Sequence, residues 1–218
     1  MPLVYQQNIN EATKLAVWHI AEEEVFFLKR VSLQKEITHP HKRLQHLAGR
    51  YLLTELFDNF PLELIQIADT KKPFLPNEAY HFSISHCGDY AAVIVSSANR
   101  VGTDIEIVSE KVGRIRDKFL TAGEQELVEE IFNIQRTMFN VQSISHVQLI
   151  TLCWSIKEAM FKWYGLGKVD FKEHLRIDKI DVDKNEFIAH CIFKKDTSIN
   201  IIVKALMFSN NVLTWTVT

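Results

Sequence analysis

The stretch HFSISHCGDYAAVIVSSANRVGTDIEI, residues 81–107, predicts three consecutive antiparallel strands. Its middle run, 91–96, is apolar over most of its length, which is typical of a central strand buried on both faces. Turn-forming residues at 87–89 and 97–100 separate this run from the strands on either side. We therefore expect an antiparallel β meander at the centre of the chain.

Helical patterns lie on both sides of the meander. Apolar residues recur at helical spacing in 41–57, directly after Pro40. A helix of about five turns is expected at 146–164, where Gly165 and Gly167 would end it. The other expected elements are a strand at 14–21, helical residues at 22–30, extended pieces at 64–68 and 73–75, a helix at 122–132 behind the capping-box pair Thr121 and Glu124, a loop at 133–145, and strands at 175–182, 187–193, 199–207 and 212–217.

Each half of the chain is thus expected to combine a long helix with an antiparallel meander. The halves meet near Asn99, and no Pro-, Gly- or Ser-rich linker separates them. We predict an α+β fold of two similar halves, 1–99 and 100–218, that pack as one body. The second half carries most of the candidate metal-binding and catalytic residues described below.

The composition narrows the function classes. The formal net charge is −2, which gives no indication of nucleic-acid binding. Three Cys residues without a CxxC pair favour reduced thiols in a reducing compartment. The N-terminus has no secretory pattern, and no segment approaches ~18 uninterrupted apolar residues. We expect a cytoplasmic protein without a nucleic-acid or membrane partner.

Two carboxylates share one face of the strand VGTDIEI, Val101–Ile107. Because strand side chains alternate, Asp104 and Glu106 project the same way, with Cα atoms roughly 6–7 Å apart. A Mg²⁺ ion between them would relieve their repulsion, and Gly102 on that face would leave room for a ligand. The alternative is a half-exposed strand whose outer face happens to be acidic, which is the more common meaning of such a strand taken alone.

A carboxylate and an ammonium lie four residues apart in the helix motif CWSIKEAMFKWYG, residues 153–165. Glu158 and Lys162 at this spacing normally form a solvated ion pair worth about 0.3–0.5 kcal/mol. The neighbouring residues favour another interpretation, because the helix is apolar nearly all round. Glu158 could complete a metal triad with the strand carboxylates, and Lys162 could neutralise phosphate charge. The crowding aromatic residues are Trp154, Phe161, Trp163 and Tyr164.

Several other residues could bind an anion. Ser85 and His86 end a strand next to a Gly turn and could cradle a phosphate, although a hairpin with a surface His is the commoner case. Arg43 and Arg50 are seven residues apart and share a helix face, which is either an anion site or an ordinary solvated surface. Lys71 and Lys72 precede a rigid turn at Pro73.

Taken together, these motifs resemble the 4′-phosphopantetheinyl transferases, specifically the larger single-chain type with two similar halves. The family strand (V/I)G(I/V)D-x-E here is VGTDIE (101–106), and the family helix (F/W)(S/C/T)xKE(S/A)xxK is WSIKEAMFK (154–162). A Gly often stands in the family where this chain has Lys71. Four further elements occur in the family order: AGRYLL (48–53), KPFL (72–75), FSISH (82–86) and FLTAGEQE (119–126).

The resemblance implies a Mg²⁺-dependent holo-[acyl-carrier-protein] synthase. Such an enzyme transfers 4′-phosphopantetheine from coenzyme A to a serine of an apo acyl or peptidyl carrier protein and releases adenosine 3′,5′-bisphosphate. It implies a monomer with pseudo-two-fold symmetry, with Glu158 and Lys162 as catalytic residues. The implied metal ligands are Asp104, Glu106 and Glu158, and the implied coenzyme A-binding residues are Arg43, Arg50, Lys72, Pro73, Ser85, His86 and Lys162.

Two other functions use the same residues. A Mg²⁺-dependent nucleotide pyrophosphohydrolase would employ the same carboxylates with water as nucleophile, and it would need no carrier protein. A non-catalytic module would only hold coenzyme A or a carrier protein. The intact carboxylates and Lys162 argue against a module that has lost catalysis. The segment 133–146 lies near the region where this family contacts its protein substrate.

Overall fold

The computed structural model describes residues 2–33, 36–137 and 144–218. The elements of its first half are β1 (Leu3–Asn10), β2 (Thr13–His19), α1 (Glu24–Leu28), α2 (Pro40–Leu56), η1 (Leu62–Leu64), β3 (Gln66–Ile67), β4 (Pro73–Phe74), β5 (His81–Cys87) and β6 (Tyr90–Ser96). Those of its second half are β7 (Val101–Ile107), α3 (Glu110–Arg114), η2 (Arg116–Lys118), α4 (Ala122–Thr137), α5 (His146–Tyr164), β8 (Leu175–Asp183), β9 (Glu186–Lys194), β10 (Ser198–Phe208) and β11 (Asn211–Val217).

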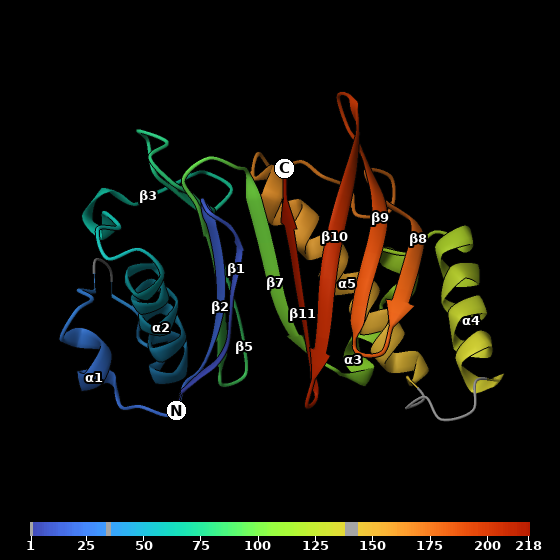
Figure 1. Cartoon of the computed structure of the whole chain (residues 1–218), viewed down its shortest axis with the longest axis horizontal. Coiled ribbons are helices and arrows are strands. Elements are labelled where there is room, and N and C mark those ends of the chain that lie inside the picture. The colour runs from blue at the N-terminus through green and yellow to red at the C-terminus, as the bar shows by residue number, and fades with distance from the viewer. Residues whose placement is uncertain (1, 34–35, 138–143) are drawn as a thin grey trace.

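The strands form two main antiparallel sheets, one from each half (Figure 1). The first sheet has the order β1–β2–β6–β5, and the second has the order β7–β11–β10–β9–β8. Strands β3 and β4 pair separately as a short hairpin. The predicted α+β class, with two halves that each combine a helix and an antiparallel sheet, is confirmed. The division at 99/100 stays a prediction, because sheet membership does not test whether either half folds alone.

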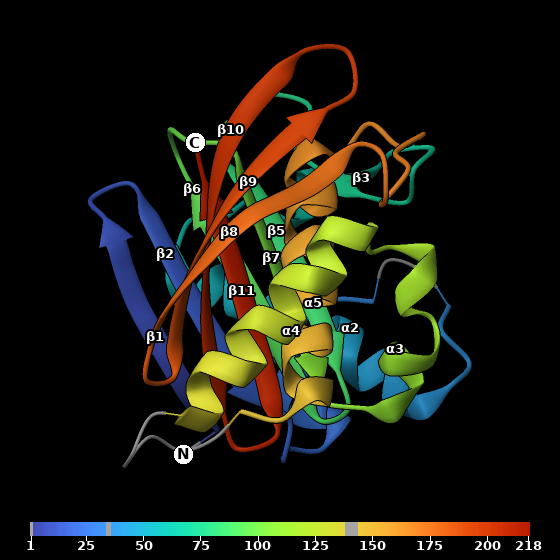
Figure 2. The same cartoon turned by 90° about the vertical axis from the view of Figure 1, so that its right-hand side faces the viewer.

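The two sheets pack against each other, and each carries a long helix on its outer face (Figures 1 and 2). Alternation along β2 shows how the sequence achieves this. Leu15 and Val17 lie in the apolar cluster between the sheets, whereas Ala16 and Trp18 lie in the cluster beneath α2. The predicted central strand at 91–96 is confirmed as β6, which lies between β2 and β5 and is buried on both faces.

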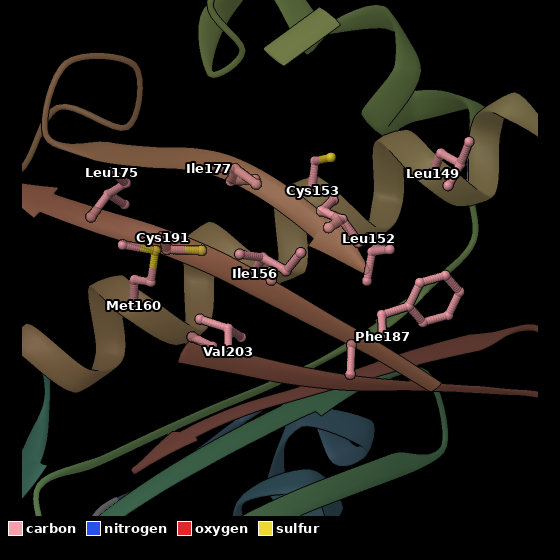
Figure 3. Packing of buried hydrophobic residues seen from close by; sticks show 14 of the residues in the cluster. Leu149, Leu152, Cys153, Ile156, Met160, Leu175, Ile177, Phe187, Cys191 and Val203 are labelled. Carbon is pink, nitrogen blue, oxygen red and sulfur yellow. The ribbon is translucent and has the colours of Figure 1, made fainter. Parts of the chain in front are cut away.

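The second half has its own core between α5 and the five-stranded sheet (Figure 3). Ile156 and Met160 of α5 share this cluster with Leu175 of β8, Cys191 of β9 and Val203 of β10. This apolar face fixes α5 against its sheet. Lys162 lies on another side of the helix, from which its ammonium reaches Asp104 of β7 and Ser85 of β5 in the first half.

Local signals set both ends of α5. The Ser145 hydroxyl accepts a hydrogen bond from the Gln148 amide, and the Gln148 side chain accepts one from the Ser145 amide, which is a capping box. At the other end, Gly165 adopts a φ of 76°, a left-handed conformation that favours glycine. The helix predicted at 146–164 is confirmed at both bounds.

The predicted loop at 133–145 was wrong in its first residues, because α4 continues to Thr137. Gln135 is buried on the same helix side as Ile131, four residues earlier. Its polar side chain interrupts the apolar pattern from which the helix was predicted. Residues 144–145 are non-helical, as predicted, and residues 138–143 lie outside the described residues.

Strand β1 and helix α3 were not predicted. β1 is an edge strand that pairs only with β2, and most of its side chains are exposed, so its sequence lacks an apolar alternation. Helix α3 has 5 residues, too few to show a helical period. Within the described ranges, no helix combines the length and apolarity needed to cross a membrane.

Candidate active site

The candidate site lies at the seam where β5, β7 and α5 meet. Strands β5 and β7 belong to different sheets, and serine hydroxyls join them. Ser83 Oγ accepts a hydrogen bond from the Thr103 amide (3.1 Å), and Ser85 Oγ accepts one from the Ile105 amide (3.2 Å). These bonds tie the FSISH motif of the first half directly to the VGTDIE strand of the second.

Asp104 is the centre of this seam and is only 2% exposed. Its carboxylate accepts hydrogen bonds from Ser85 Oγ (2.8 Å), from Ser155 Oγ (2.8 Å) and from the Lys162 ammonium (2.6 Å). A buried carboxylate is stable when such donors surround it. The alternative interpretation of β7, a half-exposed strand whose outer face happens to be acidic, is therefore wrong.

Gly102 has a different role from the one its position suggested. A Cβ atom at Gly102 would lie 2.1 Å from the Ala159 carbonyl oxygen and 2.7 Å from the Trp163 amide nitrogen. The backbone of α5 thus occupies the space that was predicted to admit a ligand, and that prediction was wrong. The glycine brings α5 close enough to β7 for Lys162 to reach Asp104.

The two remaining carboxylates lie near Asp104. Glu106 accepts hydrogen bonds from the Trp154 indole (3.3 Å) and from the Cys87 thiol (3.4 Å). Burial raises the pKa of Glu106, and the Asp104 charge raises it further. Burial also raises the pKa of Glu158 to about 7, with a second contribution from Asp104, while Lys162 acts in the opposite direction. This mutual repulsion would be relieved by a bound cation.

The chemistry of these carboxylates fits Mg²⁺, which prefers oxygen ligands. Across residues 2–33, 36–137 and 144–218, however, no three Asp, Glu, His or Cys side chains are gathered closely enough to form a ready metal site. The cationic group beside Asp104 is the Lys162 ammonium. The seam therefore offers suitable donors without a preassembled cluster of three ligands.

Lys162 connects three elements rather than pairing with Glu158 on its own helix. Its ammonium donates to Ser85 Oγ on β5 (2.8 Å) and to Asp104 on β7 (2.6 Å). The side chain is 24% exposed, so solvent or a ligand can reach it. A partly open lysine held by buried groups is well placed to bind an anion.

A cavity of about 550 Å³ adjoins this seam. Its charged and imidazole groups come from three separate segments: Arg50 on α2, Lys71 in the turn between β3 and β4, and His86 on β5. His46 and Pro73 also line it. The cavity thus combines basic side chains with a rigid apolar wall, which suits an anionic ligand.

Arg50 is a buried cation that forms no ion pair with a carboxylate of the described residues. Its Nη1 contacts His46 Nδ1 at 3.1 Å, but within the described residues its Nε has no hydrogen-bond partner. Burial lowers the pKa of Arg50, and no neighbouring carboxylate offsets this effect. An anion bound in the cavity would supply the missing partner.

Arg43 lies elsewhere, although it shares a helix face with Arg50. Its Nε donates to the Glu24 carboxylate of α1 (2.7 Å), and its Nη1 donates to the Ile37 carbonyl oxygen (3.1 Å). It does not line the cavity. The Arg43 charge is thus already neutralised by α1, and its role in anion binding stays a prediction.

Lys72 and Pro73 also occupy different positions. Pro73 lines the cavity, whereas the Lys72 ammonium donates to the Lys162 carbonyl oxygen at the end of α5. Lys71, which the sequence grouped with the possible anion-binding residues but not with the coenzyme A-binding set, does line the cavity. Sequence reasoning missed Ser155, whose hydroxyl orients Asp104, and Trp154, whose indole binds Glu106. Trp154 and Ser155 belong to the WSIKE motif, and their place in that motif was the sequence signal that could have identified them.

A second charged pair on α5 is structural. The Lys157 ammonium is fully buried and donates to the Glu124 carboxylate (2.9 Å), to the Phe119 carbonyl (2.6 Å) and to the Phe171 carbonyl (2.9 Å). Glu124 also accepts from the Ile177 amide (2.9 Å). This pair links α4, α5 and β8 within the core of the second half.

Comparison with known proteins agrees with this geometry. The family model of the 4′-phosphopantetheinyl transferase superfamily matches residues 100–214, which include both β7 and α5. Because this match covers more than half of the chain, the chain belongs to that superfamily.

Individual relatives are distant. The chain is 27% identical over 135 residues to the 4′-phosphopantetheinyl transferase AcpT of Escherichia coli O157:H7, covering 61% of this chain and 64% of AcpT. It is 30% identical over 124 residues to enterobactin synthase component D of Escherichia coli (strain K12), covering 56% and 54%. It is 26% identical over 132 residues to the L-aminoadipate-semialdehyde dehydrogenase-phosphopantetheinyl transferase of Xenopus laevis, covering 56% and 43%. The matched part spans less than two thirds of each of these relatives.

Proposed function

We propose that this protein transfers the 4′-phosphopantetheine group from coenzyme A to a serine of an apo acyl or peptidyl carrier protein and releases adenosine 3′,5′-bisphosphate. One observation carries the proposal. Lys162, Asp104 and Ser85 are hydrogen-bonded to one another beside a basic cavity. Membership of the superfamily supports the same reaction class.

The cavity would receive the nucleotide end of coenzyme A. Arg50 would pair with a phosphate there, because its buried guanidinium has no anionic partner in the part of the chain that the structure describes. His86 lies on the same wall and could donate to a phosphate oxygen. Ser85 would act mainly through the seam, since its hydroxyl already contacts Asp104, Lys162 and the Ile105 amide.

Lys162 would bind the pyrophosphate and stabilise the departing phosphate. The serine oxygen of the carrier forms a bond to the phosphorus that bears pantetheine, and the bond from that phosphorus to the bridging oxygen breaks. Negative charge accumulates on the departing bisphosphate, and a positioned ammonium is worth most at that point. Lys162 is suited to this step because Ser85 and Asp104 fix its position.

Glu158 would accept the proton of the carrier serine. In the metal-free protein, burial and the Asp104 charge raise the pKa of this carboxyl to about 7. Asp104, Glu106 and Glu158 are the residues that would hold Mg²⁺. When bound, Mg²⁺ would offset the charge of the pyrophosphate.

Release of adenosine 3′,5′-bisphosphate tests this proposal. We expect release only when coenzyme A, an apo carrier protein and Mg²⁺ are all present, and we expect EDTA to stop it. Glu158→Ala should abolish release while the variant remains folded. Release from coenzyme A alone would instead indicate a pyrophosphohydrolase, and binding without release would indicate a non-catalytic module. The monomeric state and the cytoplasmic location stay predictions.

A further inference from the structure

The turn between β3 and β4 carries two adjacent lysines in different environments. The Ala68 amide donates to the Lys72 carbonyl (3.0 Å), and the Lys71 amide donates to the Ala68 carbonyl (2.8 Å), so the turn is tightly closed. Lys71 adopts a φ of 65°, in the left-handed region. This conformation favours glycine, the residue that often stands here in the family.

Lys72 contacts the C-terminal end of α5. Its ammonium donates to the Lys162 carbonyl oxygen, and Thr70 Oγ1 in the same turn donates to the Gly165 carbonyl oxygen (3.1 Å). A Cβ atom at Gly165 would lie 2.7 Å from Lys72 Cδ and Nζ, so the absence of a side chain there admits the lysine. The last carbonyl groups of a helix lack partners within the helix, and a cation near them is favourable.

The surroundings of Lys72 keep its ammonium at this position. Burial, together with the nearby Arg100 charge, lowers the pKa of Lys72 to about 8. The group is therefore enclosed between the turn and α5 rather than extended into solvent. In this arrangement, the Lys72 ammonium is held by the Lys162 carbonyl oxygen at the end of α5.

Lys71 is exposed, and it lines a cavity that Lys72 does not line. It lines the cavity of about 550 Å³ together with Arg50 and His86. It also lines an adjoining cavity of about 180 Å³ that includes Lys162 and Ile84. Lys71 thus stands between the basic cavity and the catalytic end of α5. A residue retained in a strained backbone conformation beside a binding cavity is a candidate for function.

We propose that Lys71 binds the anionic nucleotide end of coenzyme A, and that Lys72 is a positioning residue that caps α5 and holds Lys162 at Asp104. This assignment rests on the proposed function and deepens it. It also differs from the expectation drawn from the family pattern, in which Lys72 was the coenzyme A contact. The substitution of Lys for Gly at 71 would give this chain an additional cation at the cavity.

Calorimetric binding of coenzyme A and of 3′-dephospho-coenzyme A tests the role of Lys71. We expect Lys71→Gly to weaken binding of coenzyme A by about tenfold or more, as for loss of a charge-assisted hydrogen bond, and to weaken binding of the dephospho form far less. Lys184→Gly is a matched control, because Lys184 is exposed with a φ of 56° in the turn between β8 and β9, and it lines none of the site cavities. Equal losses for both ligands, or no loss, would overturn the Lys71 assignment.

Turnover and hydrogen exchange test the role of Lys72. We expect Lys72→Met to leave the affinity for coenzyme A within about threefold, to lower kcat by about tenfold or more, and to speed amide exchange in the last turn of α5. If Lys72→Met instead loses affinity for coenzyme A without faster amide exchange in α5, Lys72 is the coenzyme A contact and the proposed positioning role is refuted. If the wild-type protein neither binds coenzyme A nor modifies a carrier, the proposed function and the Lys71 assignment are both refuted. Amide exchange in the last turn of α5 would still test whether Lys72 caps that helix.

Discussion

Two lysines on α5, Lys157 and Lys162, each pair with a carboxylate, but their surroundings differ. Lys157 is fully buried, and its ammonium is satisfied by one carboxylate and two backbone carbonyls. Lys162 is 24% exposed, pairs with Asp104 and lines a cavity of about 180 Å³ that Lys71 also lines. The comparison shows that charge and spacing do not distinguish a folding lysine from a catalytic one. What distinguishes them is whether the ammonium can be reached from solvent and can bind a further anion.

The largest effect on stability is expected from Lys157→Met. Removing one partner of a buried ion pair leaves the other charge uncompensated, so the free energy of unfolding should fall by about 3–5 kcal/mol. Urea denaturation measures this loss. The double variant Lys157→Met with Glu124→Gln should recover part of it, because the stranded charge is gone. A loss below about 1 kcal/mol would mean that this pair does not hold the second half together.

Lys162→Met should lower activity strongly and stability only moderately, in contrast to Lys157→Met. Transfer should fall by about 10²–10³-fold, because a preorganised cation at the site of developing charge is lost. Stability should fall less than in Lys157→Met, since Asp104 keeps the hydroxyl donors Ser85 and Ser155. Steady-state turnover and urea denaturation on the same preparation check both parts. A variant that unfolds readily but turns over normally would contradict the comparison.

Glu158→Gln should raise stability while removing activity. The pKa of Glu158 in the folded protein, about 7, is above its ordinary value of 4.5, so the folded state holds the proton more tightly than the unfolded state. Wild-type stability should therefore fall as pH rises from about 4.5 to 7, and Gln should avoid this loss. At pH 8 we expect the variant to be more stable by about 1–3 kcal/mol in the absence of Mg²⁺. Equal stability of the two proteins at pH 8 would contradict the electrostatic strain assigned to the seam.

The smallest effect is expected from Thr70→Val. The variant loses one hydrogen bond to the Gly165 carbonyl at the end of α5, which should lower the free energy of unfolding by about 0.5–1.5 kcal/mol. Hydrogen exchange should quicken in the last turn of α5, near Lys162, and should stay unchanged near Lys157. Uniform quickening along the whole helix would show that the turn does not act locally.

Sequence patterns predicted the site elements well because they carry strong local signals. The capping box at Ser145 and the left-handed Gly165 define α5, and alternation along β7 correctly placed Asp104 and Glu106 on one face. Strand β1 was missed because an exposed edge strand requires no apolar alternation.

Contacts between distant segments could not be predicted in the same way. That Glu24 would neutralise Arg43 depends on how α1 packs on α2. That Gly102 admits α5 rather than a ligand depends on the distance between the strand and the helix. That Lys72 reaches the Lys162 carbonyl depends on the docking of the two halves. Each of these facts is set by tertiary packing, for which a single sequence has no local signal.

The central claim is that the seam of Lys162, Asp104 and Ser85 transfers phosphopantetheine, and mass spectrometry of a carrier protein tests it most directly. Apo acyl and peptidyl carrier proteins would be incubated with this protein, coenzyme A and Mg²⁺, and then measured intact and as peptides. We predict that one serine gains the mass of phosphopantetheine with wild-type protein and gains none with Lys162→Met. An unchanged carrier mass with the wild-type protein across both carrier classes, or an equal gain with Lys162→Met, would contradict the account.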